Sequence, residues 1–255
     1  MSDEQSVYGV KAALALIERR PGDVLRLHYR ADRRAQLKGV LAWAASRKLP
    51  YRELDEESLK KVAGGSHHEG LVVIAKPLRY GSFAAEAAEA AGDRETAAER
   101  APRGPQPLWV AVDGVENPHN LGAILRSCAF FGAEGVLVGG AAPGDKVNQA
   151  AIRIAEGGAE YVRLAGEEKL AERLTALGQQ GWAVLGLETD GSPLPQQRPG
   201  RPVLLVLGHE HEGLRPEIRR ACSTVHRIAG SGTLASLNVS VAAGVALALL
   251  LQPKE

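Results

Sequence analysis

The chain has 255 residues, of which 45% are hydrophobic and 24% are charged, and its formal net charge is +1. This length and composition are typical of one large globular domain or two ordinary ones. The near-zero net charge gives no general sign of a nucleic-acid partner. The only two cysteines, Cys128 and Cys222, exclude a disulfide framework and a cysteine-based metal site, and we interpret them as buried, reduced thiols.

Neither a leader peptide nor a membrane span is predicted. The first ten residues, MSDEQSVYGV, lack the basic stretch and apolar core of a secretory signal. The longest apolar run, residues 239–251, has 13 residues, which is too short to cross a bilayer. We therefore expect a cytoplasmic protein without membrane contacts.

Residues 1–80 alternate helical and strand patterns and predict a small α/β domain. Helices are expected at residues 7–20, 36–48 and 55–64, and strands at residues 24–30, 49–55 and 70–77. This segment holds 15 Lys and Arg against 10 Asp and Glu. The excess indicates either an RNA-facing module or a solvated surface. The candidate RNA contacts are Arg26, Arg30, Arg33, Arg34, Lys38, Arg47, Lys48, Lys60 and Lys61.

The composition changes at residue 81. Residues 81–107 are rich in Ala and Glu and end in Pro and Gly, which predicts a linker. From residue 108 onward, apolar strand patterns alternate with helical ones. Strands are expected at 108–114, 134–140, 159–165, 181–188, 202–208 and 224–230, and helices near 120–131, 146–156, 167–179, 214–221 and 236–251. Continuous apolar strands indicate a parallel sheet buried on both faces, hence an α/β domain whose site lies at the carboxyl ends of its strands.

Common cofactor and metal motifs do not match. The turn after the first strand of this domain, residues 113–122, lacks the G-x-G-x-x-G of a dinucleotide-binding fold. Residues 139–146 approach a P-loop, but Asp145 stands where the lysine belongs. The sequence GHEHEG at residues 208–213 lacks the spacing that places two histidines on one helix face, so no metal is expected.

Three polar clusters remain, each after a predicted strand. They are residues 117–120 with Arg126, residues 208–214, and residues 231–244. Each has a purely structural interpretation: Asn120 as a helix cap, Arg126 as a side chain extending to solvent, Glu210 as a loop carboxylate, and Ser236 and Asn238 as caps of the last helix. Because all three follow strands of one sheet, a single shared site explains them better together.

These clusters resemble a known family. N-P-x-N-x-G-x-I-x-R at 117–126, L-G-x-E-x-x-G-L at 207–214 and S-L-N-V-S-V-A-x-G at 236–244 resemble the three motifs of the SpoU/TrmH branch of the SPOUT RNA methyltransferases, in the same order. Residues 1–80 resemble, more loosely, the substrate-binding domain of the subgroup related to the large-subunit rRNA guanosine methyltransferase.

The resemblance implies transfer of a methyl group from S-adenosyl-L-methionine (AdoMet) to the 2′-hydroxyl of a ribose in structured RNA. A guanosine of large-subunit rRNA is the first expectation, and a tRNA ribose is the alternative. It also implies a SPOUT domain over residues 108–255 that contains a deep trefoil knot, which folding rules alone would reject, and a homodimer with the site near the subunit interface. A catalytically inactive RNA-binding module and a nucleotide-dependent oxidoreductase are the rival interpretations.

The family motifs also imply roles for individual residues. Arg126 is the family's catalytic arginine, for which the resemblance implies a role either as the activating base or as an electrostatic stabiliser. Because a guanidinium stays protonated, we favour the second role, in which it clamps a phosphate and stabilises the developing alkoxide. The other expected catalytic-site residues are Asn120, Glu210, Ser236 and Asn238. The AdoMet pocket is expected around Leu207, Gly208, Ile228 and Leu237.

Overall fold

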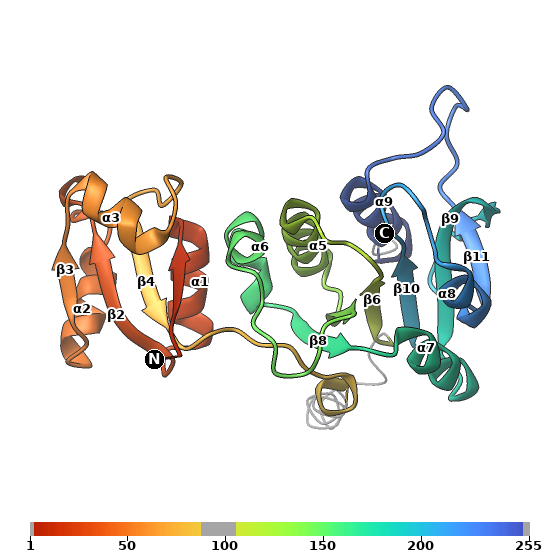
Figure 1. Ribbon diagram of the computed structural model, residues 1–255, viewed down its shortest axis with the longest axis horizontal. Helices are drawn as coiled ribbons and strands as arrows, with labels where there is room; N and C mark the ends of the chain where they lie inside the picture. Colours follow the sequence, from red (N-terminus) through yellow and green to blue (C-terminus); the bar gives the residue numbers. More distant parts are fainter. Residues whose placement is uncertain (1–2, 88–105, 252–255) are drawn as a thin grey trace.

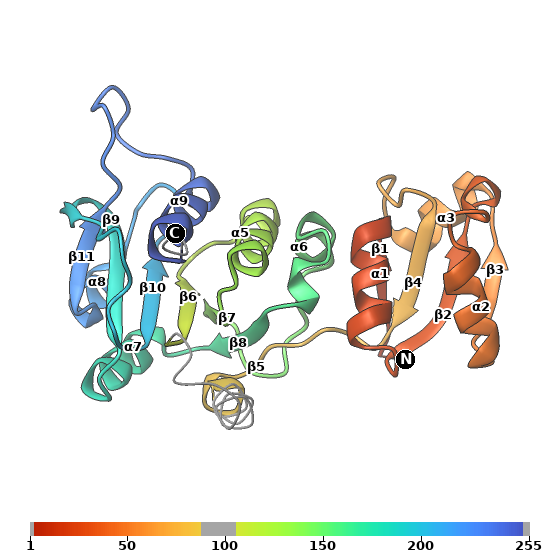
Figure 2. The same ribbon diagram turned by 180° about the vertical axis from the view of Figure 1, so that it is seen from behind.

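The computed structural model describes residues 3–87 and 106–251. They form two α/β lobes that lie side by side, each around its own β-sheet (Figures 1 and 2). Among these described residues, no helix is long and apolar enough to cross a membrane.

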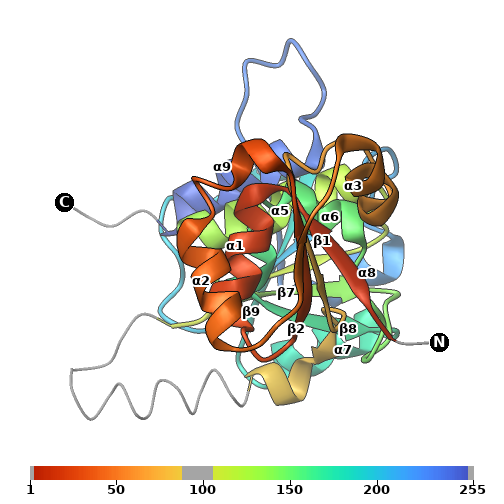
Figure 3. The same cartoon turned by 90° about the vertical axis from the view of Figure 1, so that its left-hand side faces the viewer.

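The N-terminal lobe is a four-stranded sheet of order β1-β4-β2-β3. Its elements are β1 (Gln5–Tyr8), α1 (Val10–Arg19), β2 (Val24–Tyr29), η1 (Ala31–Arg33), α2 (Lys38–Ser46), β3 (Tyr51–Glu53), α3 (Glu56–Ala63) and β4 (Leu71–Ala75). All five residues of β4 are buried, as expected for a central strand between two helical layers. Figure 3 shows α1 and α2 on one face of this sheet and α3 on the other.

One predicted helix, residues 7–20, is in fact a strand followed by a helix. Residues 5–8 pair antiparallel with β4, and α1 begins only at Val10. Gly9 separates the two elements with φ 91°, a conformation that glycine adopts without steric cost. Helical periodicity in the residues that follow concealed this edge strand, which has only four residues.

The C-terminal lobe contains a seven-stranded sheet of order β11-β9-β10-β6-β7-β8-β5, and every neighbouring pair is parallel. The strands are β5 (Gly81–Ser82), β6 (Leu108–Val112), β7 (Gly135–Gly139), β8 (Arg163–Glu167), β9 (Ala183–Pro193), β10 (Val203–Leu207) and β11 (Thr224–Arg227). The predicted parallel α/β sheet is confirmed.

Both faces of this sheet are covered by helices. The helical elements are α5 (Pro118–Phe131), α6 (Gln149–Ile154), η2 (Gly158–Glu160), α7 (Leu170–Gln179), α8 (Pro216–Ala221) and α9 (Val239–Leu251). Val110 packs in the same core as α5, α6 and α9, whereas its neighbours Trp109 and Ala111 pack in the core formed with α7 and α8. Alternate residues of one strand thus enter opposite layers, which explains its unbroken apolar sequence.

The predicted linker, residues 81–107, is described only at its ends. Its first residues are part of the C-terminal lobe: β5 pairs with β8, and the ring of Phe83 packs edge-on against Trp109 with centroids 4.9 Å apart. A strand of two residues is too short to be recognised from a repeating apolar pattern in the sequence. Residues 88–105 lie outside the described residues.

The two lobes share a continuous interface. Val7 and Leu16 of the N-terminal lobe belong to the same buried cluster as α5 and α6 residues. At its edge, the buried Gln5 donates from Nε2 to the carbonyl of Val147 at 2.9 Å and accepts from the amide of Leu78 at 2.9 Å. The lobes therefore pack against each other through apolar contacts and satisfied hydrogen bonds.

Candidate functional site

The loops that follow β6 and β10 meet at one point of the sheet. These strands are neighbours, but β7 and β8 extend the sheet beyond β6, whereas β9 and β11 extend it beyond β10. Such a reversal of strand order leaves a crevice at the carboxyl ends of the two strands, where ligands bind in open α/β sheets. The first two polar clusters of the sequence follow these two strands.

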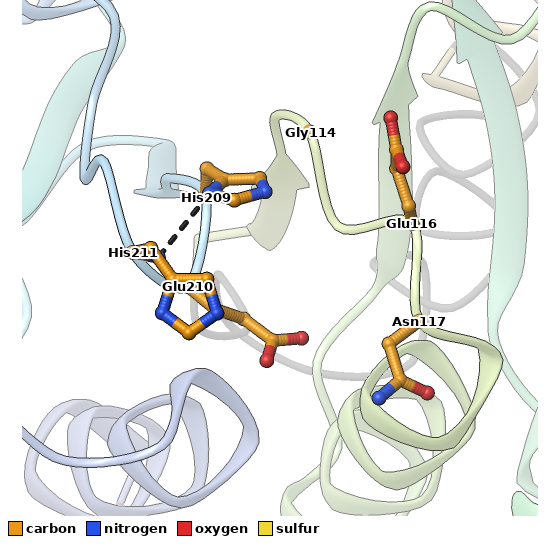
Figure 4. A pocket seen from close by; sticks show the side chains of 6 residues that line it. All are labelled: Gly114, Glu116, Asn117, His209, Glu210 and His211. Atoms are coloured by element: carbon orange, nitrogen blue, oxygen red, sulfur yellow. Dashed lines mark hydrogen bonds between the residues drawn. The ribbon is translucent and has the colours of Figure 1, made fainter.

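A pocket of about 340 Å³ occupies this crevice. It is lined from the β6 side by Gly114, Glu116 and Asn117, and from the β10 side by His209, Glu210 and His211. Figure 4 shows the two sets of side chains facing each other across the opening. The volume lies within the range of about 300–1,000 Å³ that small-molecule sites usually have.

The loop after β10 is held in a tight turn. The amide and carbonyl of His209 exchange hydrogen bonds with those of Gly213, at 2.9 and 3.0 Å. Gly213 has φ 70°, and a Cβ there would overlap the carboxylate of Glu188, which accepts a hydrogen bond from the amide of Leu214 at 2.9 Å. Gly213, the second glycine of the motif at residues 207–214, is therefore required both by its backbone conformation and by close packing against Glu188.

An ion pair joins the segments that follow β6 and β10. Asp113, whose side chain is 3% exposed, accepts two hydrogen bonds from Arg215, at 2.8 Å from Nε and 2.6 Å from Nη2. The hydrogen bonds to Asp113 raise the pKa of Arg215 above its ordinary value. A two-point Arg–carboxylate contact fixes direction as well as distance, so it sets how the two loops face each other.

The start of α5 is specified locally by its sequence. The Oδ1 of Asn117 accepts a hydrogen bond from the amide of His119 at 2.9 Å, and Pro118 occupies the first helical position, where no amide is needed. Asn117, and not Asn120, is thus the helix cap. This frees the side chain of Asn120, which lies in the first turn and is buried, to make contacts outside the helix.

Asn120 links the three predicted motifs. Its Nδ2 donates to Oε1 of Glu210, and its Oδ1 accepts from Nδ2 of Asn238 at 3.1 Å. Asn238 also caps α9, because its Oδ1 accepts from the amide of Ser240 at 2.9 Å. The structure therefore brings together one residue from each cluster.

Arg126 lies on a different side of α5. Six helical residues correspond to a rotation of about 600° and a rise of about 9 Å, which separates it from Asn120 along and around the helix. Its side chain is 55% exposed, and Nη1 forms an ion pair with Oε1 of Glu156 at 2.9 Å. No described contact joins the guanidinium of Arg126 to the side chain of Asn120.

The remaining predicted site residues are divided between the pocket and a projecting segment. Leu207 ends β10 and Gly208 follows it, both buried next to the pocket. Ile228 is half-buried, and Ser236 and Leu237 are exposed in the segment between β11 and α9, which projects from the body of the lobe (Figure 1). No described contact joins these last three side chains to the pocket.

His209 is held by hydrogen bonds within its own loop. The Nδ1 of His209 accepts from the amides of His211 and Glu212, at 3.2 and 3.4 Å. Within residues 3–87 and 106–251, no three His, Cys, Asp or Glu side chains are grouped to hold a metal ion.

Several predicted RNA-contacting residues already have carboxylate partners. Arg26 pairs with Glu4, Arg30 with Asp32 and Glu56, and Arg34 with Glu53. In the part of the chain that the structure covers, no ion pair with a carboxylate is described for Arg33, Lys38, Arg47, Lys48, Lys60 or Lys61. The hydrogen bond from the amide of Ser58, together with the charge of Lys61, nevertheless lowers the pKa of Asp55. Among the predicted RNA contacts, these lysine and arginine side chains carry positive charge that no described ion pair neutralises, so they can bind phosphate groups.

Four residues of the site region escaped sequence reasoning: Asp113, Glu156, Glu188 and Arg215. Asp113 lies near the end of a predicted strand and Arg215 directly follows the second motif, so the sequence placed both next to the candidate site. Their pairing spans 102 residues and appears only in the fold.

Two family models match this chain. Residues 107–248 match the model described as the SpoU rRNA Methylase family, and residues 6–81 match one described as RNA 2′-O ribose methyltransferase substrate binding. The chain belongs to the SpoU rRNA methylase family. The resemblance inferred from the three motifs is thereby confirmed, and the two matches fall on the two lobes.

Curated SpoU relatives cover the chain almost completely. A protein of Pseudomonas aeruginosa named 23S rRNA (guanosine-2′-O-)-methyltransferase RlmB is 34% identical over 262 residues, covering 100% of this chain and 98% of the relative. An Escherichia coli O157:H7 protein named Uncharacterized tRNA/rRNA methyltransferase YfiF is 34% identical over 96% of this chain. The chain spans 67% of that relative, and 66% of a similar Haemophilus influenzae protein.

Solved structures show the same fold. A crystal structure titled RNA 2′-O ribose methyltransferase is 26% identical with a TM-score of 0.71, covering 97% of this chain and 87% of that one. An AdoMet-bound rRNA methyltransferase from Sinorhizobium meliloti is 22% identical, also with a TM-score of 0.71, covering 97% and 86%. The chain thus shares its two-lobed fold with these solved structures.

Proposed function

We propose that this chain transfers a methyl group from AdoMet to the 2′-hydroxyl of a ribose, and that its substrate is a guanosine of large-subunit rRNA. Family membership supports the reaction, and the RlmB relatives, matched over nearly their whole length, support the substrate. A ribosomal RNA substrate would place the protein in the cytoplasm.

The observation that carries the proposal is the Glu210–Asn120–Asn238 chain of hydrogen bonds beside the pocket. Each of the three side chains comes from a different motif, and the pocket lies at the reversal of strand order. If Asn238 served only to cap α9, residues from three motifs would have no need to meet beside one pocket.

The residues present fit AdoMet in part. AdoMet supplies an electrophilic methyl group on a positively charged sulfonium, and the carboxylates of Glu116 and Glu210 line the pocket with negative charge. A Cβ on Gly208 would overlap the carbonyl of Gly213, so this glycine lets the loop after β10 fold back closely on itself. The polar lining offers little apolar surface to an adenine ring, so the proposed pocket needs further residues.

We assign those residues to the segment 228–238. Leu234 is 79% exposed and Leu237 is 47% exposed, although both are apolar. Ile228, Ser236 and Leu237 would complete the cofactor site when this segment closes over the loop after β10. The segment connects β11, at one edge of the sheet, to α9, which packs beside α5. The proposed trefoil knot requires this connection to pass through the loop that follows β10.

Arg126 is the proposed catalytic arginine. A guanidinium remains protonated, so it stabilises negative charge and does not remove the proton. Its rise of about 9 Å along α5 from Asn120 suits contact with a phosphate that flanks the target ribose. Asn120, Glu210, Asn238 and Ser236 would orient the ribose and the loops around it.

The proposed assembly is a homodimer formed through α5 and α9. These helices pack side by side and present apolar side chains to solvent, with Phe130 82% exposed and Val241 50% exposed. Exposed apolar side chains on two packed helices offer surface that a partner can bury. A second copy that covers this face would bury both side chains. Because Phe130 and Arg126 are on the same helix, the subunit interface would then lie close to the proposed catalytic arginine.

We also propose that residues 1–80 form the RNA-binding domain, with the catalytic domain starting at residue 108. The N-terminal domain would grip RNA through phosphates and shape, because only 11 aromatic residues are available in the whole chain for stacking on bases.

The test is transfer of labelled methyl groups from AdoMet to purified ribosomal RNA and to tRNA. Label on a ribose 2′-oxygen of large-subunit rRNA, recognised by resistance of the adjacent phosphodiester to alkaline cleavage, is expected. Label only on tRNA would replace the substrate but keep the reaction. Label on a base, or AdoMet binding without transfer to either RNA, would overturn the proposed reaction.

A further inference from the structure

Residues 156–158 lie between two helices of different lobes. A Cβ placed on Gly157 would lie 2.8 Å from the Cβ of Ala15 in α1. A Cβ placed on Gly158 would lie 2.9 Å from the Cα of Arg126 in α5. Because both positions have no room for a side chain, the two helices pack directly on this backbone.

The same segment is anchored at its other end. Glu160 has a side chain that is 1% exposed, and Arg20 of the N-terminal lobe binds both of its oxygens, at 2.7 Å from Nε and 2.9 Å from Nη2. Such a two-point, largely buried contact fixes the position of η2 against the N-terminal lobe.

Glu156 occupies an unusual backbone conformation at the start of this segment. Its φ is 47°, in the left-handed region that non-glycine residues seldom adopt. Residues held in such conformations by their surroundings are often functional. The fixed backbone therefore determines where the carboxylate of Glu156 lies.

That carboxylate is shared between the two lobes. Its Oε1 pairs with Nη1 of Arg126 at 2.9 Å, and its Oε2 pairs with Nζ of Lys11 at 2.5 Å. The hydrogen bond from Lys11, together with the charge of Arg126, holds the pKa of Glu156 below its ordinary value. Glu156 is the partner that the structure gives Arg126 within the described residues.

We propose that Glu156 is a positioning residue for Arg126, and that its second contact, to Lys11, makes the orientation of the guanidinium depend on the docked N-terminal lobe. The inference rests on the proposed function, in which Arg126 acts on RNA. An ion pair this exposed contributes little to stability, so orientation is the role that remains.

The test compares three single variants in RNA methylation. Glu156→Gln keeps the size of the side chain and removes its charge; kcat should fall by about 10- to 100-fold, because small misplacement of a catalytic group costs that much, while KM for RNA and AdoMet affinity change little. Lys11→Met should lower kcat in the same direction by a smaller factor. Tyr161→Phe is the matched control, since it removes a 2.8 Å hydrogen bond to Glu18 across the same lobe interface, and it should leave kcat unchanged.

A double-mutant cycle separates positioning from a structural effect. In an Arg126→Ala background, Glu156→Gln should cause no further loss of kcat, and the thermal midpoint of each variant should stay close to that of the parent. Losses that multiply, or a Glu156→Gln enzyme with full kcat beside an impaired Arg126→Ala enzyme, would overturn this inference alone. A fully active Arg126→Ala enzyme would instead overturn the proposed role of Arg126, and this inference with it.

Discussion

The Nδ2 of Asn238 donates a hydrogen bond to the Oδ1 of Asn120 at 3.1 Å, across 118 residues of sequence. Asn120 also donates a hydrogen bond to Glu210, so that α9, α5 and the loop after β10 are tied together. The Oδ1 of Asn238 caps α9, and its Nδ2 binds Asn120, so capping and linking depend on different atoms of one amide group.

Those two roles predict different effects for two similar substitutions. Asn238→Ala and Asn148→Ala each remove a helix-capping side chain, which should lower the free energy of unfolding by about 1 kcal/mol. Asn148 caps α6 by accepting from the amide of Ala150 at 2.8 Å and makes no described contact with the pocket. Only Asn238→Ala should reduce methylation, by roughly 10-fold or more. Equal activity of the two variants in a rate assay would leave Asn238 as a cap only.

Arg126→Ala should fold, bind AdoMet and lose roughly 10²-fold or more in methylation rate, because one charge that stabilises a developing anion is removed. Single-turnover kinetics measure the rate, and calorimetry with AdoMet measures binding. Methylation near the wild-type rate would contradict the catalytic assignment.

Arg215→Met should destabilise the protein more than Arg219→Met. Asp113 is buried and would be left without its partner, at a cost of about 1–3 kcal/mol. Arg219 pairs with the exposed Asp190, and loss of such a surface pair should cost about 0–1 kcal/mol. Urea unfolding of both variants gives the comparison, and equal losses would show that the Asp113 pair does not hold the loops.

Stability should decline in alkaline solution through the two thiols, of which Cys128 is buried and Cys222 is half-buried. Burial raises the pKa of Cys222 from 9.0 to about 11 and that of Cys128 further. Above the unfolded value the unfolded chain has lost these protons and the folded chain keeps them, so the free energy of unfolding falls as pH rises from about 9 to 11. A Cys128→Ala/Cys222→Ala variant should show a shallower decline in urea unfolding between pH 8 and 10.5. An unchanged slope would assign the decline to other groups.

Lys60 and Lys61 should contribute to RNA binding more than Lys48. They lie one turn before Ala63, whose carbonyl accepts from Gln149 of the catalytic lobe at 3.0 Å, whereas Lys48 precedes β3 at the far edge of the sheet. In Lys60→Gln/Lys61→Gln, the slope of log affinity against log salt should shrink by about 0.7–0.9 for each lost phosphate contact. Equal slopes for this variant and Lys48→Gln would remove the two lysines from the RNA surface.

Local sequence alone determined much of the catalytic lobe. The apolar run at residues 108–112 predicts a strand buried on both faces, and in the structure Trp109 and Val110 enter opposite cores. Asn117 and Pro118 start α5, and Gly132 ends it with φ 75°. These features depend on neighbouring residues and on one repeating pattern, so they can be read without the fold.

Other features were decided only by tertiary structure. β1 and β5 are too short for a periodicity and exist because β4 and β8 offer edges on which they pair. The partners of Asp113 and Arg126 are Arg215 and Glu156, and no local pattern selects them. A charged side chain takes whichever opposite charge the folded backbone brings within reach, and that choice is made by contacts between segments far apart in the chain.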